Sequence, residues 1–444
     1  MTYQEFKQAT IDFAKEQQIV DYELYYTESE ATSIQTFKDE VKQYSTEVSK
    51  GVCFRCVIDG KAGYASTEDF TEKEAVAIVL RAVENAKSIE SEEASFIHKC
   101  GDTYAVAEKC DLPKISGAQM VDVALALQKE IYACDERVSD GTQSAVVYGG
   151  EKYALCNSNG LDLTDEITIA RCSAFAIVKD GDEMFNGGKN KQGNLLTIDL
   201  KAVAKDAVEE AVSTIGAGSV PSGKYNVVFS NEVMGSFLST FASVFSAENA
   251  QKGMSLLAGK EGEQIAADII TIVDDPRYKD SQVKRTFDGE GVATYAKNVV
   301  DGGKLTTLLH NLKTAAKAGV KSTGNASKAS YAAVVGVSPF TFYIQPMDGT
   351  KEALFEKAGE GIYVTDLAGL HAGANPITGE FSLAATGFVI EDGKKGAPVK
   401  NFTVSGNFFD LLKDIEMRGG DLEFLGGRIG SPSALVRGIA VAGK

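Results

Sequence analysis

Residues 231–250, NEVMGSFLSTFASVFSAENA, decide the fold of the second half of this chain. Ser230 or Asn231 can cap a first helical turn at the start of this stretch. Apolar side chains then recur at the three- and four-residue spacing of a helix: Met234, Phe237, Leu238, Phe241, Val244 and Phe245. The pattern predicts one amphipathic helix over the whole stretch, with its apolar face packed into a core.

The composition around this stretch is that of an ordinary globular protein. A chain of 444 residues with 44% hydrophobic and 24% charged residues can bury more than one core, so we expect two or three domains. The formal net charge of -17 repels nucleic acid, whose nonspecific binding depends on Lys and Arg. We therefore expect protein or peptide partners and no direct nucleic-acid contact. No window approaches the ~18 uninterrupted apolar residues of a membrane span, so no membrane association is expected.

The cysteines and histidines are unevenly distributed. Without a signal-type segment at the start of the chain, an odd number of cysteines indicates a reducing cytoplasm. The second half contains no cysteine and only two histidines, His310 and His371. A zinc site there would need both histidines and additional carboxylates. All seven cysteines lie in the first half: Cys53, Cys56, Cys100, Cys110, Cys134, Cys156 and Cys172.

The sequence of the first half predicts two blocks with the same order of helices and strands. Capping boxes at residues 2–5 and 116–119 each begin a helix, four or five short strand-like runs follow, and a second helix closes each block. This plan predicts two related α+β lobes, residues 1–100 and 101–217, which an internal duplication would explain. The Gly- and Pro-containing stretch 216–223, GAGSVPSG, marks the main boundary.

The second half, residues 222–444, is mostly strand and turn after its opening helix. Its strand-like runs are separated by Asp-Gly turns at residues 301–302, 348–349 and 392–393. We expect a mostly antiparallel, barrel- or sandwich-like β domain, and therefore an α+β fold for the whole chain.

Several local patterns have both a structural and a functional interpretation. Cys53 and Cys56 have CxxC spacing, but side chains three apart on a strand face opposite sides, so we interpret them as structural. The pair Asp274-Asp275 precedes Pro276 and favours a turn over a cation site. His371 lies in the loop GLHAGANP without a matching Ser-Asp or second His, so we expect a solvent-facing loop histidine.

A set of longer motifs carries a family resemblance. In chain order they are RTFDGEGVAT (285–294), DGGKL (301–305), TGNA (323–326), ANPITGEFS (374–382), GFVIEDGK (387–394), PV (398–399) and IAVAG (439–443). Together they resemble the TldD/PmbA family, also called modulator of DNA gyrase or the TldD/TldE peptidase family. Within it the sequence is most similar to the PmbA (TldE) branch.

The resemblance implies a cytoplasmic metallopeptidase made of two similar chains. In the family the TldD chain carries His-Glu-x-x-x-His on the helix that opens its C-terminal domain, with a Cys ligand near its C-terminus. In this chain Ser239 and Thr240 stand at the first His and the Glu, and Val244 stands at the second His. Arg428 lies near the position of the Cys ligand. The resemblance thus implies no catalytic residue and no metal in this chain, with zinc in a TldD-like partner.

Three functions remain open at this point. The first is a non-catalytic subunit that pairs with a TldD-like chain, or with itself, and helps to bind unstructured peptides; His371 and Asn375 are the weaker candidates for a peptide cleft. The second is a stand-alone hydrolase with an unrecognised site. The third is a binding protein that modulates DNA gyrase through a protein contact.

Overall fold

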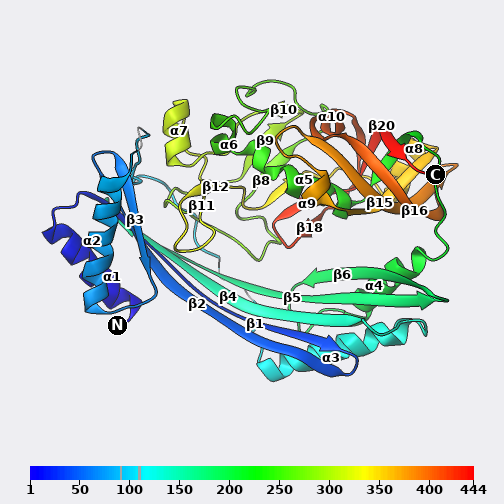
Figure 1. Cartoon of the computed structure of the whole chain (residues 1–444), viewed down its shortest axis with the longest axis horizontal. Coiled ribbons are helices and arrows are strands. Elements are labelled where there is room, and N and C mark those ends of the chain that lie inside the picture. The colour runs from blue at the N-terminus through cyan, green and yellow to red at the C-terminus, as the bar shows by residue number, and fades with distance from the viewer. Residues whose placement is uncertain (91–92, 109–111) are drawn as a thin grey trace.

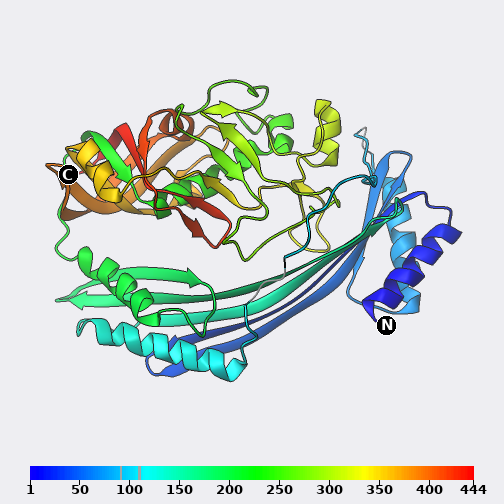
Figure 2. The same cartoon turned by 180° about the vertical axis from the view of Figure 1, so that it is seen from behind.

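The computed structural model describes residues 1–90, 93–108 and 112–444, so Cys110 lies outside the described residues. A long curved sheet forms the N-terminal part, and the β-rich C-terminal domain lies across its concave side (Figure 1). The view from behind shows the same arrangement, with helices on the convex side and at the far end of the sheet (Figure 2). None of the helices in the described residues combines the length and the apolar character that crossing a bilayer requires.

The N-terminal part is built from two α-βββ-α units that share one sheet. The first unit contains α1 (Tyr3–Glu16), β1 (Asp21–Phe37), β2 (Glu40–Ile58), β3 (Lys61–Thr67) and α2 (Glu72–Ser88). The second contains α3 (Gly117–Cys134), β4 (Gln143–Asn157), β5 (Asp162–Asp180), β6 (Glu183–Gln192) and α4 (Leu200–Ser213). The strand order β3-β2-β1-β4-β5-β6 places β1 beside β4 at the centre, so the strands of the second unit follow outward from that antiparallel pair in the same order as those of the first.

The strand count per unit corrects the sequence prediction. Four or five short strands were expected in each lobe, whereas each unit has three longer ones. The run at 22–29 and residues 32–37 of the next run belong to one strand, β1, because β2 and β4 on either side provide hydrogen-bonding partners across the polar residues between them. Such non-local pairing overrides the local polar signal.

A matched pair of glycines supports the likeness of the two units. A Cβ on Gly63 in β3 would lie 1.9 Å from the carbonyl oxygen of Ala82 in α2. A Cβ on Gly187 in β6 would lie 2.2 Å from the carbonyl oxygen of Ala207 in α4. Each helix therefore packs directly on the backbone of its outer strand, at a distance that only glycine permits.

The C-terminal domain contains two larger sheets. The first has the order β16-β15-β14-β7-β20-β17, and an additional β16–β20 pairing closes it into a partial barrel. The second has the order β10-β9-β8-β13-β19-β18. Most pairings are antiparallel, although β7–β14 and β13–β19 are parallel. The predicted α+β class with a β-rich, barrel-like C-terminal domain is confirmed.

The elements of this domain are short outside the barrel. The barrel sheet comprises β7 (Gly223–Phe229), β14 (Gly361–Ala368), β15 (Glu380–Glu391), β16 (Lys394–Asn407), β17 (Ile415–Arg418) and β20 (Ala434–Ala442). The second sheet comprises β8 (Ile272–Asp274), β9 (Lys297–Asp301), β10 (Lys304–Leu305), β13 (Phe342–Ile344), β18 (Glu423–Leu425) and β19 (Ile429–Ser431), and β11 (Ala326–Ser327) pairs with β12 (Gly336–Val337). Short helices complete the domain: α7 (Leu312–Ala318), α8 (Lys351–Ala358), α9 (Leu370–Gly373) and α10 (Phe408–Lys413).

The opening stretch of this domain is helical but broken. Instead of one helix over 231–250, the chain forms α5 (Asn231–Phe241), the 3₁₀ turn η1 (Ala242–Phe245) and α6 (Ala247–Gln251). The break falls at Ser246, whose backbone is extended and forms a bridge with Leu309. Because the N–H of Ala247 donates to the Leu309 carbonyl, pairing with a distant segment replaces the continuing helix.

The predicted core face of this stretch is correct. Its aromatic side chains meet partners from both larger sheets: the ring centroid of Phe237 lies 4.8 Å from that of Phe381, and the ring centroid of Phe245 lies 5.3 Å from that of Phe342. The stretch thus lies between the barrel and the second sheet and joins them in one core.

Candidate functional site

The end of α5 carries the first two positions at which the family places metal-site residues. Ser239 is exposed, and Thr240 is half-buried. The Thr240 hydroxyl donates to the Ser236 carbonyl one turn earlier at 2.8 Å, which is the usual internal bond of a threonine in a helix. These two side chains provide hydroxyl groups but neither an imidazole nor a carboxylate.

Val244 lies in a different environment from Ser239. It is completely buried in the core between the two C-terminal sheets, within the 3₁₀ turn that follows α5. The backbone carbonyl of Val244 accepts a hydrogen bond from the Ser255 hydroxyl at 2.5 Å. The structure therefore does not bring the side chains of Ser239 and Val244 together in one solvent-accessible site.

The turn between β18 and β19 carries Arg428 close to α5. Both strands pack against α5, and a Cβ on Gly235 would lie 3.2 Å from the Leu425 side chain. The Arg428 guanidinium donates to the carbonyls of Pro339 at 3.2 Å and Phe340 at 3.4 Å. Arg428 thus fixes the segment before β13 to the β18–β19 turn.

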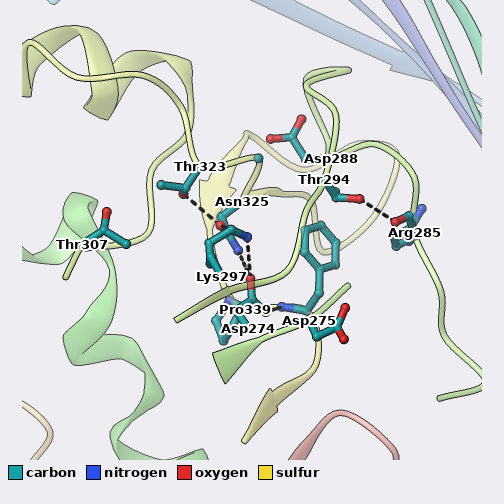
Figure 3. A network of polar contacts seen from close by, with 12 residues as sticks. Asp274, Asp275, Arg285, Asp288, Thr294, Lys297, Thr307, Thr323, Asn325 and Pro339 are labelled. Atoms are coloured by element: carbon teal, nitrogen blue, oxygen red, sulfur yellow. Dashed lines mark hydrogen bonds and ion pairs between the residues drawn. The ribbon is translucent and has the colours of Figure 1, made fainter. Parts of the chain in front are cut away.

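That segment leads to a buried polar network centred on Asp274 (Figure 3). The carboxylate of Asp274 lies 3.1 Å from the Lys297 ammonium and accepts from the Asn325 amide at 2.7 Å. Its other oxygen accepts from the N–H of Phe340 at 2.8 Å. Thr323 completes the network by donating to the Asn325 amide oxygen at 2.8 Å.

This network corrects the interpretation of the aspartate pair. Asp275 forms the predicted turn, because its carboxylate accepts from the N–H of Arg277. Asp274 instead ends β8 with no exposed surface and pairs with a lysine. A buried carboxylate is tolerated only with such a partner and further donors.

A second buried carboxylate belongs to the loop around residue 288. Asp288 accepts hydrogen bonds from the N–H groups of Glu290, Val292 and Ala326. Burial, followed by the nearby carboxylate of Glu290, raises the pKa of Asp288 to about 8. Asp288 thereby fixes the turn of the RTFDGEG motif and joins it to the TGNA motif.

A third cluster joins the N-terminal sheet to the C-terminal domain. The guanidinium of Arg55 lies 3.0 Å from the carboxylate of Glu23 and 2.9 Å from that of Glu290. Lys328 lies 3.7 Å from Glu23, and the Glu23 and Lys328 side chains are both completely buried. Burial opposes the charge on Arg55, but Glu23 and Glu290 raise its pKa above the usual value. These ion pairs join the N-terminal sheet to the C-terminal domain.

These charged residues were not predicted from the sequence as a cluster, although a signal was present. Glu23 and Arg55 are charged residues inside the apolar strand runs DYELYY and GVCFRCV. A charge at such a position is rarely buried without a partner. Glu290 and Asn325 lie in the motifs that carry the family resemblance, but their contacts depend on segments far away in the chain.

The two candidates for a peptide cleft lie elsewhere. His371 is exposed on the short helix α9, and Asn375 is exposed in the following loop. The Asn375 side chain accepts from the N–H of Ile377 at 2.9 Å, so it stabilises the turn before β15. In the described part of the chain, neither residue forms a hydrogen bond or ion pair with Ser239 or Arg428, and their role in a cleft stays a prediction.

The remaining expectations for cysteine and histidine are consistent with structural roles. Cys56 lies with Val52 and Phe54 in the core under α2, whereas Cys53 points to the opposite face of β2. His310 is buried, and burial lowers its pKa. Across residues 1–90, 93–108 and 112–444, no three His, Cys, Asp or Glu side chains gather in a way that could hold a metal ion.

Comparison with known proteins extends over the whole chain. Family models described as PmbA/TldA metallopeptidase domain 1, central domain and C-terminal domain match residues 22–87, 110–215 and 222–443. An uncharacterized protein of Methanocaldococcus jannaschii is 30% identical over 429 residues, which are 94% of this chain and 95% of that protein. Other relatives are named metalloprotease and metalloprotease PmbA.

Solved structures share the fold. A Thermotoga maritima protein, named as a proposed modulator of a DNA gyrase, is 31% identical with a TM-score of 0.91, covering 99% of this chain and 100% of that one. TldE from Thermococcus kodakarensis is 21% identical with a TM-score of 0.89, covering 98% of this chain and 100% of that one. With three family models along its length and a relative of 30% identity over nearly all of it, this chain belongs to the PmbA/TldD metallopeptidase family.

Proposed function

We propose that this chain is the PmbA/TldE-like, non-catalytic subunit of a cytoplasmic metallopeptidase that acts on unstructured peptides. In this proposal a TldD-like partner with His-Glu-x-x-x-His supplies the zinc, and this chain supplies none. The observation that carries the proposal is Val244, which stands at the position of the second His and is completely buried in the apolar core. A valine offers no N, O or S donor, so it cannot replace a zinc ligand.

Other features of the same region support this function. Thr240, at the position of the general base, uses its hydroxyl inside the helix. Arg428, near the third ligand, is a permanent cation that donates to two carbonyls, and a cation disfavours a metal ion beside it. The cytoplasmic assignment is supported by the free state of six cysteines, two of them exposed, as expected in a reducing compartment.

The test is co-expression with a His-Glu-x-x-x-His relative from the same organism. We expect the two chains to co-purify and to cleave an unfolded fluorogenic peptide together, with all activity lost after chelation. The matched control is the partner with its first motif His changed to Ala, which should still bind this chain but cleave nothing. This chain alone should not cleave the peptide.

Two results would replace the proposal. Chelator-sensitive cleavage by this chain alone, with about one zinc per chain, would make it a stand-alone hydrolase. Capture of gyrase subunits from cytosol, without a family relative, would favour the gyrase-modulating function. Pairing of this chain only with itself would also contradict the proposed TldD-like partner.

A further inference from the structure

A large groove lies between the edge of the N-terminal sheet and the C-terminal barrel. Its volume is about 970 Å³. One wall is formed by β6 and α4, and the other by the start of α5 and the barrel strands β14 to β16. Met184 and Phe175 lie on the sheet side and are 66% and 41% exposed. The groove is separate from the buried networks around Asp274 and Arg55.

The strand β6 presents its unpaired edge to this groove. It is the last strand of the sheet and pairs only with β5. The N–H of Gly188 points away from β5, because it donates to the Glu210 carboxylate of α4 at 2.8 Å. Backbone direction alternates along an antiparallel strand, so the N–H groups of Asn186 and Asn190 also point outward. In the described part of the chain, neither N–H group donates a backbone hydrogen bond outside the strand pairing of the sheet.

The same end of the groove is rich in carboxylates. Burial raises the pKa of Glu210, the Gly188 N–H lowers it, and the nearby carboxylates of Glu232 and Asp366 raise it further. The Lys189 ammonium lies 3.0 Å from Glu232 and 3.0 Å from Glu423, and is thus already paired. Among the residues that line this end, Asp366 has no ion-pair partner in the described part of the chain. The groove as a whole is lined by six carboxylates and four lysines, so a ligand with positive side chains would meet an excess of negative charge: Asp206, Glu209, Glu210, Glu232, Asp366 and Glu423, against Lys189, Lys351, Lys395 and Lys400.

We propose that this groove binds an extended, basic peptide segment that adds as a strand to the outer edge of β6. Backbone groups of the peptide would pair with those of Asn186 and Asn190, and a Lys or Arg side chain would face Glu210 and Asp366. Because the hydrogen bonds of this pairing are made to the peptide backbone, the groove can bind unstructured peptides of varied sequence. The barrel side chains Thr365 and Thr386 line the opposite wall of the groove, across from β6. The inference rests on the proposed function, since it names the peptide class that this chain would deliver.

The test measures binding to this chain alone, by fluorescence anisotropy of a labelled peptide of alternating lysine and threonine. We expect binding that weakens with salt, and no comparable binding of the alternating glutamate and threonine peptide. Asn186→Pro removes one outward N–H without removing a hydrogen bond to β5, and should weaken binding by about tenfold. The matched control Asn186→Ala keeps the N–H and should bind like the wild type. Glu210→Gln with Asp366→Asn should weaken binding of the lysine peptide only.

Hydrogen exchange on the wild-type chain keeps the test decisive even if the proline variant misfolds. Peptide addition should slow exchange within 183–192 and leave the opposite edge strand β3 unchanged. Equal binding by Asn186→Pro and wild type, equal binding of both peptides, or no protection in β6 would overturn the inference. If partner capture succeeds while peptide binding fails, only this inference is lost. If peptide binding succeeds while partner capture fails, the proposed function is lost.

Discussion

The buried pair of Asp274 and Lys297 makes a quantitative prediction for stability. Asp274 has no exposed surface, the Lys297 side chain is 5% exposed, and their charged atoms lie 3.1 Å apart. Lys297→Met would leave the carboxylate with two neutral donors, Asn325 and the N–H of Phe340. Removing one partner of a buried pair costs about 3–5 kcal/mol, and the two remaining donors place the expected loss near ~3 kcal/mol.

Urea denaturation measures this loss. Because the chain has no tryptophan, unfolding is followed by circular dichroism, with hydrogen exchange in 272–301 as the local readout for the C-terminal domain. With an m-value of about 2–3 kcal/mol per molar urea, the midpoint should fall by ~1–1.5 M. Lys304→Met on the neighbouring strand β10 is the matched control, because Lys304 is exposed and its loss should cost under about 0.5 kcal/mol.

A second substitution separates charge from packing. Asp274→Asn combined with Lys297→Met leaves no buried charge in the network and should regain much of the lost stability. The reasoning fails if Lys297→Met costs less than about 1 kcal/mol, or if the double variant is no more stable than the single one.

Three further predictions concern other parts of the fold. Gly187→Ala should destabilise the chain by about 1–3 kcal/mol, because a Cβ would lie 2.2 Å from the Ala207 carbonyl; calorimetry should show no such loss for Gly218→Ala, where a Cβ meets open space. Burial lowers the pKa of His310, so the neutral form is favoured in the folded state and the free energy of unfolding should decline as pH falls through about 6.5. His310→Phe should flatten that slope in urea titrations at several pH values, and an unchanged slope would exclude His310 as its source. In a Cys110→Ser background, a thiol reagent should label Cys100 and Cys134 quickly but not Cys53, Cys56, Cys156 or Cys172, which are buried; burial raises the pKa of Cys56 and Cys172 to about 11. Rapid labelling of more than two thiols would contradict this burial.

The parts of the fold that depend on local chemistry were predictable from the sequence. The capping boxes at Thr2 and Ser116 form as expected and begin α1 and α3. The apolar face of α5 was predicted correctly because helical spacing is a local property. The break at Ser246 and the joining of short runs into β1 were missed, since both depend on backbone pairing with distant segments.

The candidate site shows the same limit. The sequence shows that Ser239, Thr240 and Val244 stand at the positions of the family's His-Glu-x-x-x-His motif. It does not show that Val244 is buried, because that burial depends on the packing of both C-terminal sheets. Likewise, the sequence shows that Asp274 and Lys297 are charged without showing that they meet. The pairing of Glu23 with Arg55 and Glu290 spans the two parts of the molecule, and local periodicity contains no information about it.

The antiparallel pair of β1 and β4 has a consequence for how such a chain can be divided. Their register runs without a shift from Glu23 opposite Asn157 to Gln35 opposite Ala145. A fragment ending near residue 100 would lack β4, and the edge of β1 that pairs with β4 would be exposed. The strand most similar to the missing β4 would be β1 of a second fragment. The β1–β4 pair thus has the geometry that two copies of the first unit would form if they paired symmetrically through β1.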